Sequence, residues 1–181
     1  MTTLQQIPLQ TIDGDAATLG DYAGSVLLVV NTASKCGLTP QYQGLEALYT
    51  RFRDDGLAVL GFPSNDFAGQ EPGSDADIAS FCAVNYQVDF PLFSKITVVG
   101  PQKHPLYASL IAALPKAADT DSFREKLKGY KIDPNPAPEV LWNFEKFLIG
   151  RDGRPVARFS PDLPPEDPKL VAAVERELQR P

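Results

Sequence analysis

Two short apolar runs place the strongest constraint on how this chain folds. The runs SVLLVVNT (25–32) and LAVLGFP (57–63) are apolar over nearly their whole length, which is typical of strands buried on both faces. Between them, residues 40–54 carry regularly spaced apolar side chains, and Pro40 suits a first helical turn, so a helix is predicted there. A strand, a helix and a strand in this order form a parallel pair with a right-handed crossover. The sequence therefore predicts an α/β fold, and the apolar residues of the predicted helix are Leu45, Leu48, Tyr49 and Phe52.

Local signals on either side of this unit predict a hairpin and a second helix. The pair Asp13-Gly14 lies between partly apolar flanks, which predicts an N-terminal hairpin within residues 4–23 with this pair as its turn. Further along, Ser74 and Asp77 have the spacing of a capping box, which marks the start of a helix. The side chains expected to share one face of that helix are Ile78, Phe81, Cys82 and Asn85.

The second half of the chain completes a mixed pattern of strands and helices. A further strand is expected within residues 91–99, and two antiparallel strands within residues 143–160 joined by the turn 151–154. Helices are expected at 104–114, at about 122–128 inside a polar, proline-containing insertion (115–140), and at 165–178. The expected architecture is a central mixed sheet flanked by helices.

Length and charge limit the classes of function. A chain of 181 residues with 43% hydrophobic content suits one domain, residues 1–181. The net charge of −6 argues against a nucleic acid or an anionic membrane as partner. The segment MTTLQQIPLQ does not resemble a secretory signal, and no apolar run approaches the ~20 residues that span a bilayer, so we expect a cytoplasmic protein without a membrane partner.

The cysteines and the histidine do not predict a metal site. The chain has one histidine and two cysteines, far apart, which is not the paired spacing of a zinc site, and no cofactor is expected. In the cytoplasm two cysteines form no structural disulfide by default, although this does not exclude a disulfide that forms during catalysis.

Cys36 lies where open α/β sheets collect their functional groups. It follows the first buried strand in NTASKCGLTPQY and precedes the first predicted helix, at the carboxyl end of a parallel strand. Helix N-terminal amides and neighbouring Lys35 favour a thiolate there. A small buried apolar residue is the competing interpretation, because most free cysteines are of that kind. Local sequence alone does not choose between the two.

Four stretches carry a family resemblance that bears on this choice. NTASKCGLTPQY, GFPSNDFAGQEPG, FPLFSKI and LWNFEKFLIGRDG occur in this order, and together they resemble the glutathione peroxidase family, in particular its cysteine-containing bacterial thioredoxin/glutathione peroxidase branch. The resemblance implies a thioredoxin-like fold and the reduction of hydrogen peroxide and organic hydroperoxides. By motif, the catalytic centre would consist of Cys36, Gln70, Trp142 and Asn143.

The chemistry of these side chains suits the implied reaction. The Cys36 thiolate would attack the peroxide O–O bond and become a sulfenic acid. The amides of Gln70 and Asn143 and the indole N–H of Trp142 are donors that stabilise a thiolate and a departing oxygen. Taken alone, Trp142 and Asn143 would more simply be a core aromatic and a strand-start cap.

Cys82 is the candidate for resolving the sulfenic acid. It matches the position of the second cysteine in bacterial relatives, whereas the plant and insect pattern would place that cysteine at Ala83. A Cys36–Cys82 disulfide would then be reduced by thioredoxin, and the helix from Ser74 would have to loosen for the sulfurs to meet. The alternative is that Cys82 is simply packed inward. Ser64 stands where many two-cysteine relatives have a third cysteine, and the role of Asp66 is open.

Several alternatives remain beside this interpretation. Glutathione is the competing reductant, although an acidic chain without a basic cluster near its motifs is a poor match for that anion. A peroxide-sensing redox relay would use the same sulfenic acid to oxidise a partner protein. A general thiol-disulfide oxidoreductase lacks its C-x-x-C pair here. His104 is expected to act as a cap or surface residue rather than as a protease base. The oligomeric state is not predicted.

Overall fold

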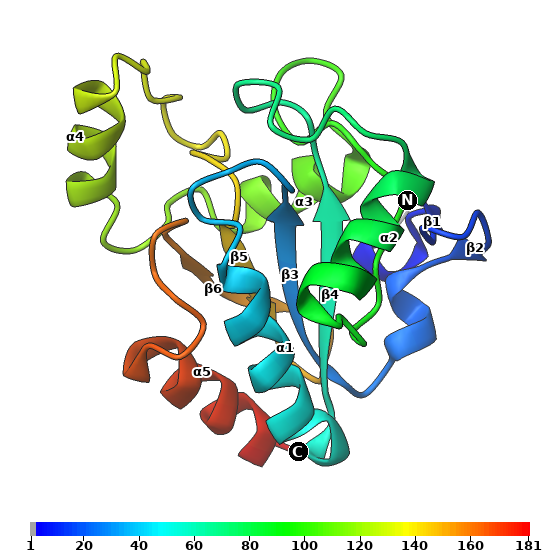
Figure 1. The fold of residues 1–181 in the computed structure, drawn as a ribbon. Helices are drawn as coiled ribbons and strands as arrows, with labels where there is room; N and C mark the ends of the chain where they lie inside the picture. The colour runs from blue at the N-terminus through cyan, green and yellow to red at the C-terminus, as the bar shows by residue number, and fades with distance from the viewer. Residues whose placement is uncertain (1–2) are drawn as a thin grey trace.

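The structure, a computed structural model, describes residues 3–181. A four-stranded sheet in the order β4-β3-β5-β6 forms its centre (Figure 1). Strands β3 (Val26–Thr32) and β4 (Leu57–Pro63) pair in parallel, while β5 (Lys146–Ile149) runs antiparallel to β3 and pairs with β6 (Pro155–Phe159). Every residue of β3, β4 and β5 is buried. The predicted mixed sheet is confirmed.

Helices cover both faces of this sheet. Helices α1 (Gln41–Phe52) and α5 (Pro168–Gln179) lie on one face and α3 (Pro105–Ala113) lies on the other (Figure 1). Helix α2 (Asp75–Tyr86) packs beside α1, and α4 (Asp121–Gly129) lies in the insertion, away from the sheet. The five α-helices within residues 3–181 were all predicted. Their bounds differ from the predicted ones by a few residues, because short 3₁₀ turns and loops take up the ends.

The N-terminal hairpin is present but shorter than predicted. It pairs β1 (Leu9–Gln10) with β2 (Ala16–Ala17), and short 3₁₀ helices precede and follow it at Leu4–Gln6 and Leu19–Tyr22. The turn is a longer loop than Asp13-Gly14 alone, because the Gly14 N–H donates to the Thr11 carbonyl at 2.9 Å. Gly14 has φ of +97°, a conformation that favours glycine.

The further strand expected within residues 91–99 is wrong. The segment makes only isolated bridges, Leu92 with Gly61 and Phe93 with Thr11. Its backbone hydrogen bonds alternate between β4 and the N-terminal hairpin as far as Ser94, but the Lys95 N–H then donates to the Asp75 side chain and Ile96 bonds the Pro63 carbonyl instead, so no continuous ladder forms. Pro91 contributes no N–H to such a ladder, which is a second reason for the failure.

Helix α2 confirms the predicted cap but not the whole predicted face. Ser74 and Asp77 form a capping box, with the Asp77 N–H donating to Ser74 Oγ at 3.1 Å and the Ser74 N–H donating to Asp77 Oδ2 at 3.0 Å. Cys82 is buried, but Asn85 is exposed and its side chain donates to the carbonyl of Phe81 one turn earlier. Within residues 3–181, no helix is both long and apolar enough to cross a membrane.

Candidate functional site

The topology brings the predicted site residues to one edge of the sheet. Strands β3 and β4 end at the same edge because they are parallel and paired from Val26–Leu57 to Thr32–Pro63. Strand β5 starts at this edge, since it is antiparallel and Lys146 pairs with Val30. The segments 33–40, 64–74 and 140–145 therefore meet there, as the loops above β3 and β4 in Figure 1 show.

Cys36 lies in a turn ahead of α1 and not in its first helical turn. The Cys36 N–H donates to Thr39 Oγ1 at 3.0 Å, and this hydroxyl donates in turn to the carbonyl of Ala33 at 2.8 Å. The backbone N–H of Leu38 donates to Cys36 Sγ at 3.3 Å. Cys36 as a whole residue is 9% exposed. A hydrogen-bond donor directed at its sulfur stabilises negative charge on that atom. The expected helix amide is thus replaced by a turn amide.

Gln70 and Asn143 are hydrogen-bonded to one another. Asn143 Nδ2 donates to Gln70 Oε1 at 2.8 Å. The backbone carbonyl of Gln70 accepts the N–H of Lys35 at 3.0 Å, which ties Gln70 to the residue before Cys36. Asn143 is fully buried, and within residues 3–181 its Oδ1 has no hydrogen-bond partner. The structure thus connects three segments that are far apart in the sequence.

Trp142 is held by its backbone and by an aromatic contact. Its carbonyl accepts Asn31 Nδ2 at 3.0 Å, and the Asn31 carbonyl accepts the N–H of Phe144 at 2.6 Å. The indole is 8% exposed and lies 5.3 Å from the ring of Phe67, centroid to centroid. In the described chain, the hydrogen bond to Cys36 Sγ comes from Leu38 rather than from Gln70, Trp142 or Asn143. The expected donor contacts to the sulfur are therefore not formed in this structure.

Glu71 is a buried carboxylate that the sequence analysis missed. It is 1% exposed, and its Oε2 accepts the hydroxyl of Ser34 at 3.1 Å. Burial raises its pKa, and the hydrogen bonds from Ser34 and the charge of Lys95 oppose that rise. Lys95 Nζ donates to the carbonyls of Glu71 at 2.9 Å and Gly73 at 2.5 Å, which fixes the segment after Gln70. The only sequence signal was its place within the GQEPG motif.

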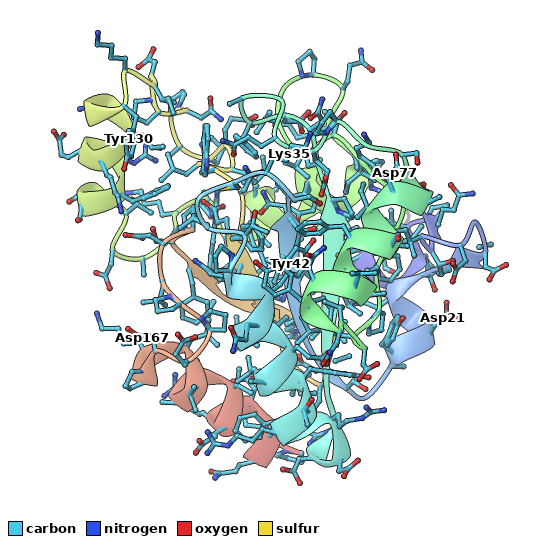
Figure 2. The ribbon with its side chains drawn as sticks, in the orientation of Figure 1. Asp21, Lys35, Tyr42, Asp77, Tyr130 and Asp167 are labelled. Carbon is cyan, nitrogen blue, oxygen red and sulfur yellow. The ribbon has the colours of Figure 1, made fainter. Side chains whose placement is uncertain are left out.

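Cys82 is buried beneath the site on α2. It is 1% exposed, and both cysteines are free thiols. Burial raises the pKa of Cys82 to about 11, the nearby Tyr42 hydroxyl lowers it and the charge of Glu71 raises it. Tyr42, which sequence periodicity did not single out, is fully buried near the centre of the fold (Figure 2). At neutral pH Cys82 is therefore a protonated thiol.

Asp66 and His104 have local structural roles. Asp66 Oδ2 accepts the hydroxyl of Ser64 at 2.8 Å and the N–H of Val98 at 2.6 Å, so it joins the loop after β4 to the segment before α3. His104 caps α3, with its Nδ1 accepting the N–H of Leu106 at 3.0 Å. Burial lowers the pKa of His104. The predicted capping role of His104 is confirmed.

Comparison with known proteins gives a consistent result along the chain. The family model described as glutathione peroxidase matches residues 4–111. The thioredoxin/glutathione peroxidase BtuE of Escherichia coli (strain K12) is 48% identical over 174 residues, which is 95% of each chain. The hydroperoxy fatty acid reductase gpx1 of Synechocystis sp. is 45% identical over 176 residues, covering 97% of this chain and 96% of the other.

Solved structures show the same fold. The crystal structure of Trgpx in apo form superposes with a TM-score of 0.72 at 32% identity, covering 100% of this chain and 99% of that one. A thioredoxin-family thiol:disulfide interchange protein from Chlorobium tepidum TLS superposes with a TM-score of 0.60 at 13% identity over 98% of this chain and 96% of that one, a likeness of fold alone. The fold is thioredoxin-like, as the resemblance of the four motifs implied.

Proposed function

The chain belongs to the glutathione peroxidase family and is a thiol peroxidase, and on that premise we propose that Cys36 is its nucleophile and that Gln70, Trp142 and Asn143 complete the catalytic centre. One observation carries this assignment more than any other. The Asn143–Gln70 hydrogen bond and the bond from Lys35 N–H to the Gln70 carbonyl join these residues at the sheet edge that presents Cys36.

The proposed first step is a two-electron reduction of the peroxide. The Cys36 thiolate attacks one peroxide oxygen, the O–O bond breaks, and the sulfur becomes a sulfenic acid while the other oxygen leaves and takes up a proton as water or an alcohol. The hydrogen bond through Oε1 leaves Gln70 Nε2 to donate to the departing oxygen. Asn143 Oδ1 is buried and unpaired in residues 3–181, so the proposed part of Asn143 in the reaction is to hold the Gln70 amide through Nδ2.

The proposed second step resets the enzyme through Cys82. Its thiolate attacks the Cys36 sulfenic acid, a disulfide forms and hydroxide leaves as water. The burial of Cys82 and its raised pKa oppose this attack in the closed structure, so α2 must loosen first. Helix α2 is suited to that, because only Ile78 and Cys82 among its residues are buried.

A dithiol is the proposed reductant of this disulfide. The family supports a thiol reductant, and we favour thioredoxin over glutathione because the chain carries a net charge of −6 and glutathione is also an anion. Residues 1–181 are proposed to act as one domain. A cytoplasmic location also remains a prediction, which cell fractionation tests.

The test is peroxide turnover by wild type, Cys36→Ser and Cys82→Ser, each with thioredoxin and with glutathione at matched peroxide. We expect Cys36→Ser to lose turnover with both reductants and Cys82→Ser to lose it with thioredoxin. Undiminished turnover by Cys36→Ser would remove the nucleophile assignment. Persistence of a sulfenic acid in wild type, without a Cys36–Cys82 disulfide in intact-mass analysis, would remove the role of Cys82. Greater efficiency with glutathione would reverse the order of reductants.

A further inference from the structure

A cavity of about 360 Å³ opens between the Cys36 turn and α2. We call it the α2 cavity. Figure 2 shows Lys35 and Asp77, from its two sides, at the same end of the molecule. The cavity is lined by Ser34 and Lys35 from the turn, by Glu71, Pro72 and Gly73 from the segment after Gln70, and by Asp77, Ile78 and Phe81 from α2.

The cavity adjoins two of the proposed catalytic residues along the chain. Lys35 directly precedes Cys36, and Glu71 directly follows Gln70. The Lys35 N–H donates to the Gln70 carbonyl at 3.0 Å, which joins the two segments directly beside the residues that line the cavity. The cavity therefore begins one residue away from Cys36 and from Gln70 along the chain.

The apolar side chains of the α2 cavity differ in how much surface the protein core leaves uncovered. Ile78 is 1% exposed and closes the cavity from α2. Phe81 is half-buried, and its ring contacts Tyr86 at a centroid distance of 5.9 Å. Pro72 is exposed at the rim. An apolar guest would cover the exposed parts of Phe81 and Pro72 and release water from them.

The polar groups of the cavity are engaged within the protein. Glu71 accepts the Ser34 hydroxyl, and Asp77 Oδ2 accepts the backbone N–H of Ser74. The hydrogen bonds to Ser74 hold the pKa of Asp77 below its usual value, so Asp77 is ionised at neutral pH. The ionisable side chains that line the cavity are thus one lysine and two carboxylates, an excess of acidic groups. The cavity therefore offers no net attraction to an anionic group.

We propose that the α2 cavity binds the uncharged, apolar organic group of a hydroperoxide substrate, with Phe81 as the residue that sets this preference. The inference rests on the proposed function, because it presumes peroxide reduction at Cys36. Hydrogen peroxide has no organic group and gains nothing from the cavity. An apolar hydroperoxide gains contact with Phe81 and Ile78 while its O–O bond lies at the sulfur.

The test compares cumene hydroperoxide, an uncharged apolar probe, with hydrogen peroxide. Second-order rate constants for the loss of the Cys36 thiol are measured in single turnover, with the protein in excess, by quenching with an alkylating agent and mass analysis. We expect Phe81→Ala to lower the ratio of the cumene to the hydrogen peroxide constant by about five- to tenfold, the range for losing part of an apolar pocket. Phe81→Leu, which keeps more of the core contact, is expected to lower it by about two- to threefold.

Val84→Ala is the matched control, since Val84 is on the same helix, is 76% exposed and does not line the cavity. We expect this variant to keep the wild-type ratio. An unchanged ratio in both Phe81 variants, with wild type still oxidised by hydrogen peroxide, would overturn the cavity assignment and leave the proposed function in place. If neither peroxide oxidises Cys36 in wild type, the proposed function fails and the cavity assignment fails with it.

Discussion

The amides of Gln70 and Asn143 have separate tasks because one donates to the other. Asn143 Nδ2 is committed to Gln70 Oε1, which orients the Gln70 amide and leaves its Nε2 for the role toward the reacting oxygen that we propose. A side chain positioned in this way needs no reorganisation when charge develops in the transition state. Asn143 is fully buried, so its own orientation is fixed by packing at the start of β5.

We predict that Asn143→Ala slows the oxidation of Cys36 by hydrogen peroxide about 100-fold, the usual effect of losing one preorganised polar group. The measurement is the single-turnover rate of thiol loss. Asn85→Ala is the control, because Asn85 is exposed on α2 and bonds only to its own helix. A rate within threefold of wild type in Asn143→Ala would contradict the role of the Gln70–Asn143 pair.

The raised pKa of Cys82 leads to a prediction about pH. The folded value of about 11 exceeds the ordinary value of 9.0, so this burial stabilises the closed α2 below about pH 9 and the stabilisation is lost as pH rises toward 11. If α2 opens before Cys82 reacts, the disulfide forms from a solvated thiol. The rate of disulfide formation should then rise with pH and level off near pH 8.5–9, the range in which a solvated thiol ionises.

Quenched-flow mass analysis from pH 6 to pH 10 measures this rate after Cys36 has been oxidised. Cys82→Ser supplies the baseline, since it forms no disulfide. A rate that kept rising about tenfold per pH unit through pH 10 would show that Cys82 reacts from its buried position.

At the scale of elements, α2 is held more firmly at its start than along its length. The capping box of Ser74 and Asp77 satisfies its first amides, and Asp75 accepts hydrogen bonds from Ser94 and Lys95. Beyond that, only two of its side chains are buried. Helices anchored so sparsely open at a lower free energy than the core around them. Opening of α2 is thus controlled by its N-terminal contacts.

We predict that Ser74→Ala weakens α2 by about 1 kcal/mol, the usual cost of losing an N-cap, and so increases its open population about fivefold. Amide hydrogen exchange within α2 should quicken by that factor, and the Cys36–Cys82 disulfide should form faster. Thr120→Ala is the control, because Thr120 precedes α4 without making a side-chain cap. Faster exchange in α2 with an unchanged rate of disulfide formation would separate helix opening from resolution.

At the scale of the whole molecule, one buried guanidinium ties the insertion to the sheet. Arg158 on β6 pairs with Glu145 at 2.8 Å, and both side chains are almost fully buried. The same guanidinium donates to the carbonyls of Leu114 at 2.8 Å and Glu139 at 3.2 Å, at the two ends of the insertion. The side chain of Arg158 therefore joins both ends of the insertion to β6.

We predict that Arg158→Met lowers the free energy of unfolding by about 3–5 kcal/mol, because it leaves the Glu145 carboxylate buried without its partner. Chemical denaturation monitored by the fluorescence of Trp142 measures this loss. Arg154→Met is the control, since Arg154 pairs with Asp152 on the exposed surface, where ion pairs contribute little. Equal stability of the two variants would contradict the structural role of Arg158.

Sequence patterns were sufficient for the α-helices and for the four strands of the central sheet, and they supplied the site residues that we propose. The buried runs of β3 and β4, the periodicity of the helices and the capping box of α2 are local, and each follows from one stretch of chain. The four motifs likewise name Cys36, Gln70, Trp142 and Asn143. The strand expected within residues 91–99 failed because its bonds to β4 lose their register after Phe93, where the Lys95 N–H donates to the Asp75 side chain and not to β4.

Contacts between distant segments required the folded chain. The hydrogen bond between Asn143 and Gln70 joins residues 73 positions apart in the sequence, and the hydrogen bond from Asn31 to the Trp142 carbonyl joins residues 111 positions apart. Neither hydrogen bond can be predicted from the neighbouring sequence, because an amide side chain can bond to many donors and acceptors and only the fold brings one of them into reach. The burial of Cys82 is of the same kind: helical periodicity placed it on a face, but only the packing of other elements around it buries the thiol and so raises its pKa, with the charge of Glu71 adding to the rise and the Tyr42 hydroxyl opposing it. Periodicity within one helix predicts which face of the helix a side chain occupies. The pKa of that side chain depends on the burial and the charged groups that other elements supply on that face.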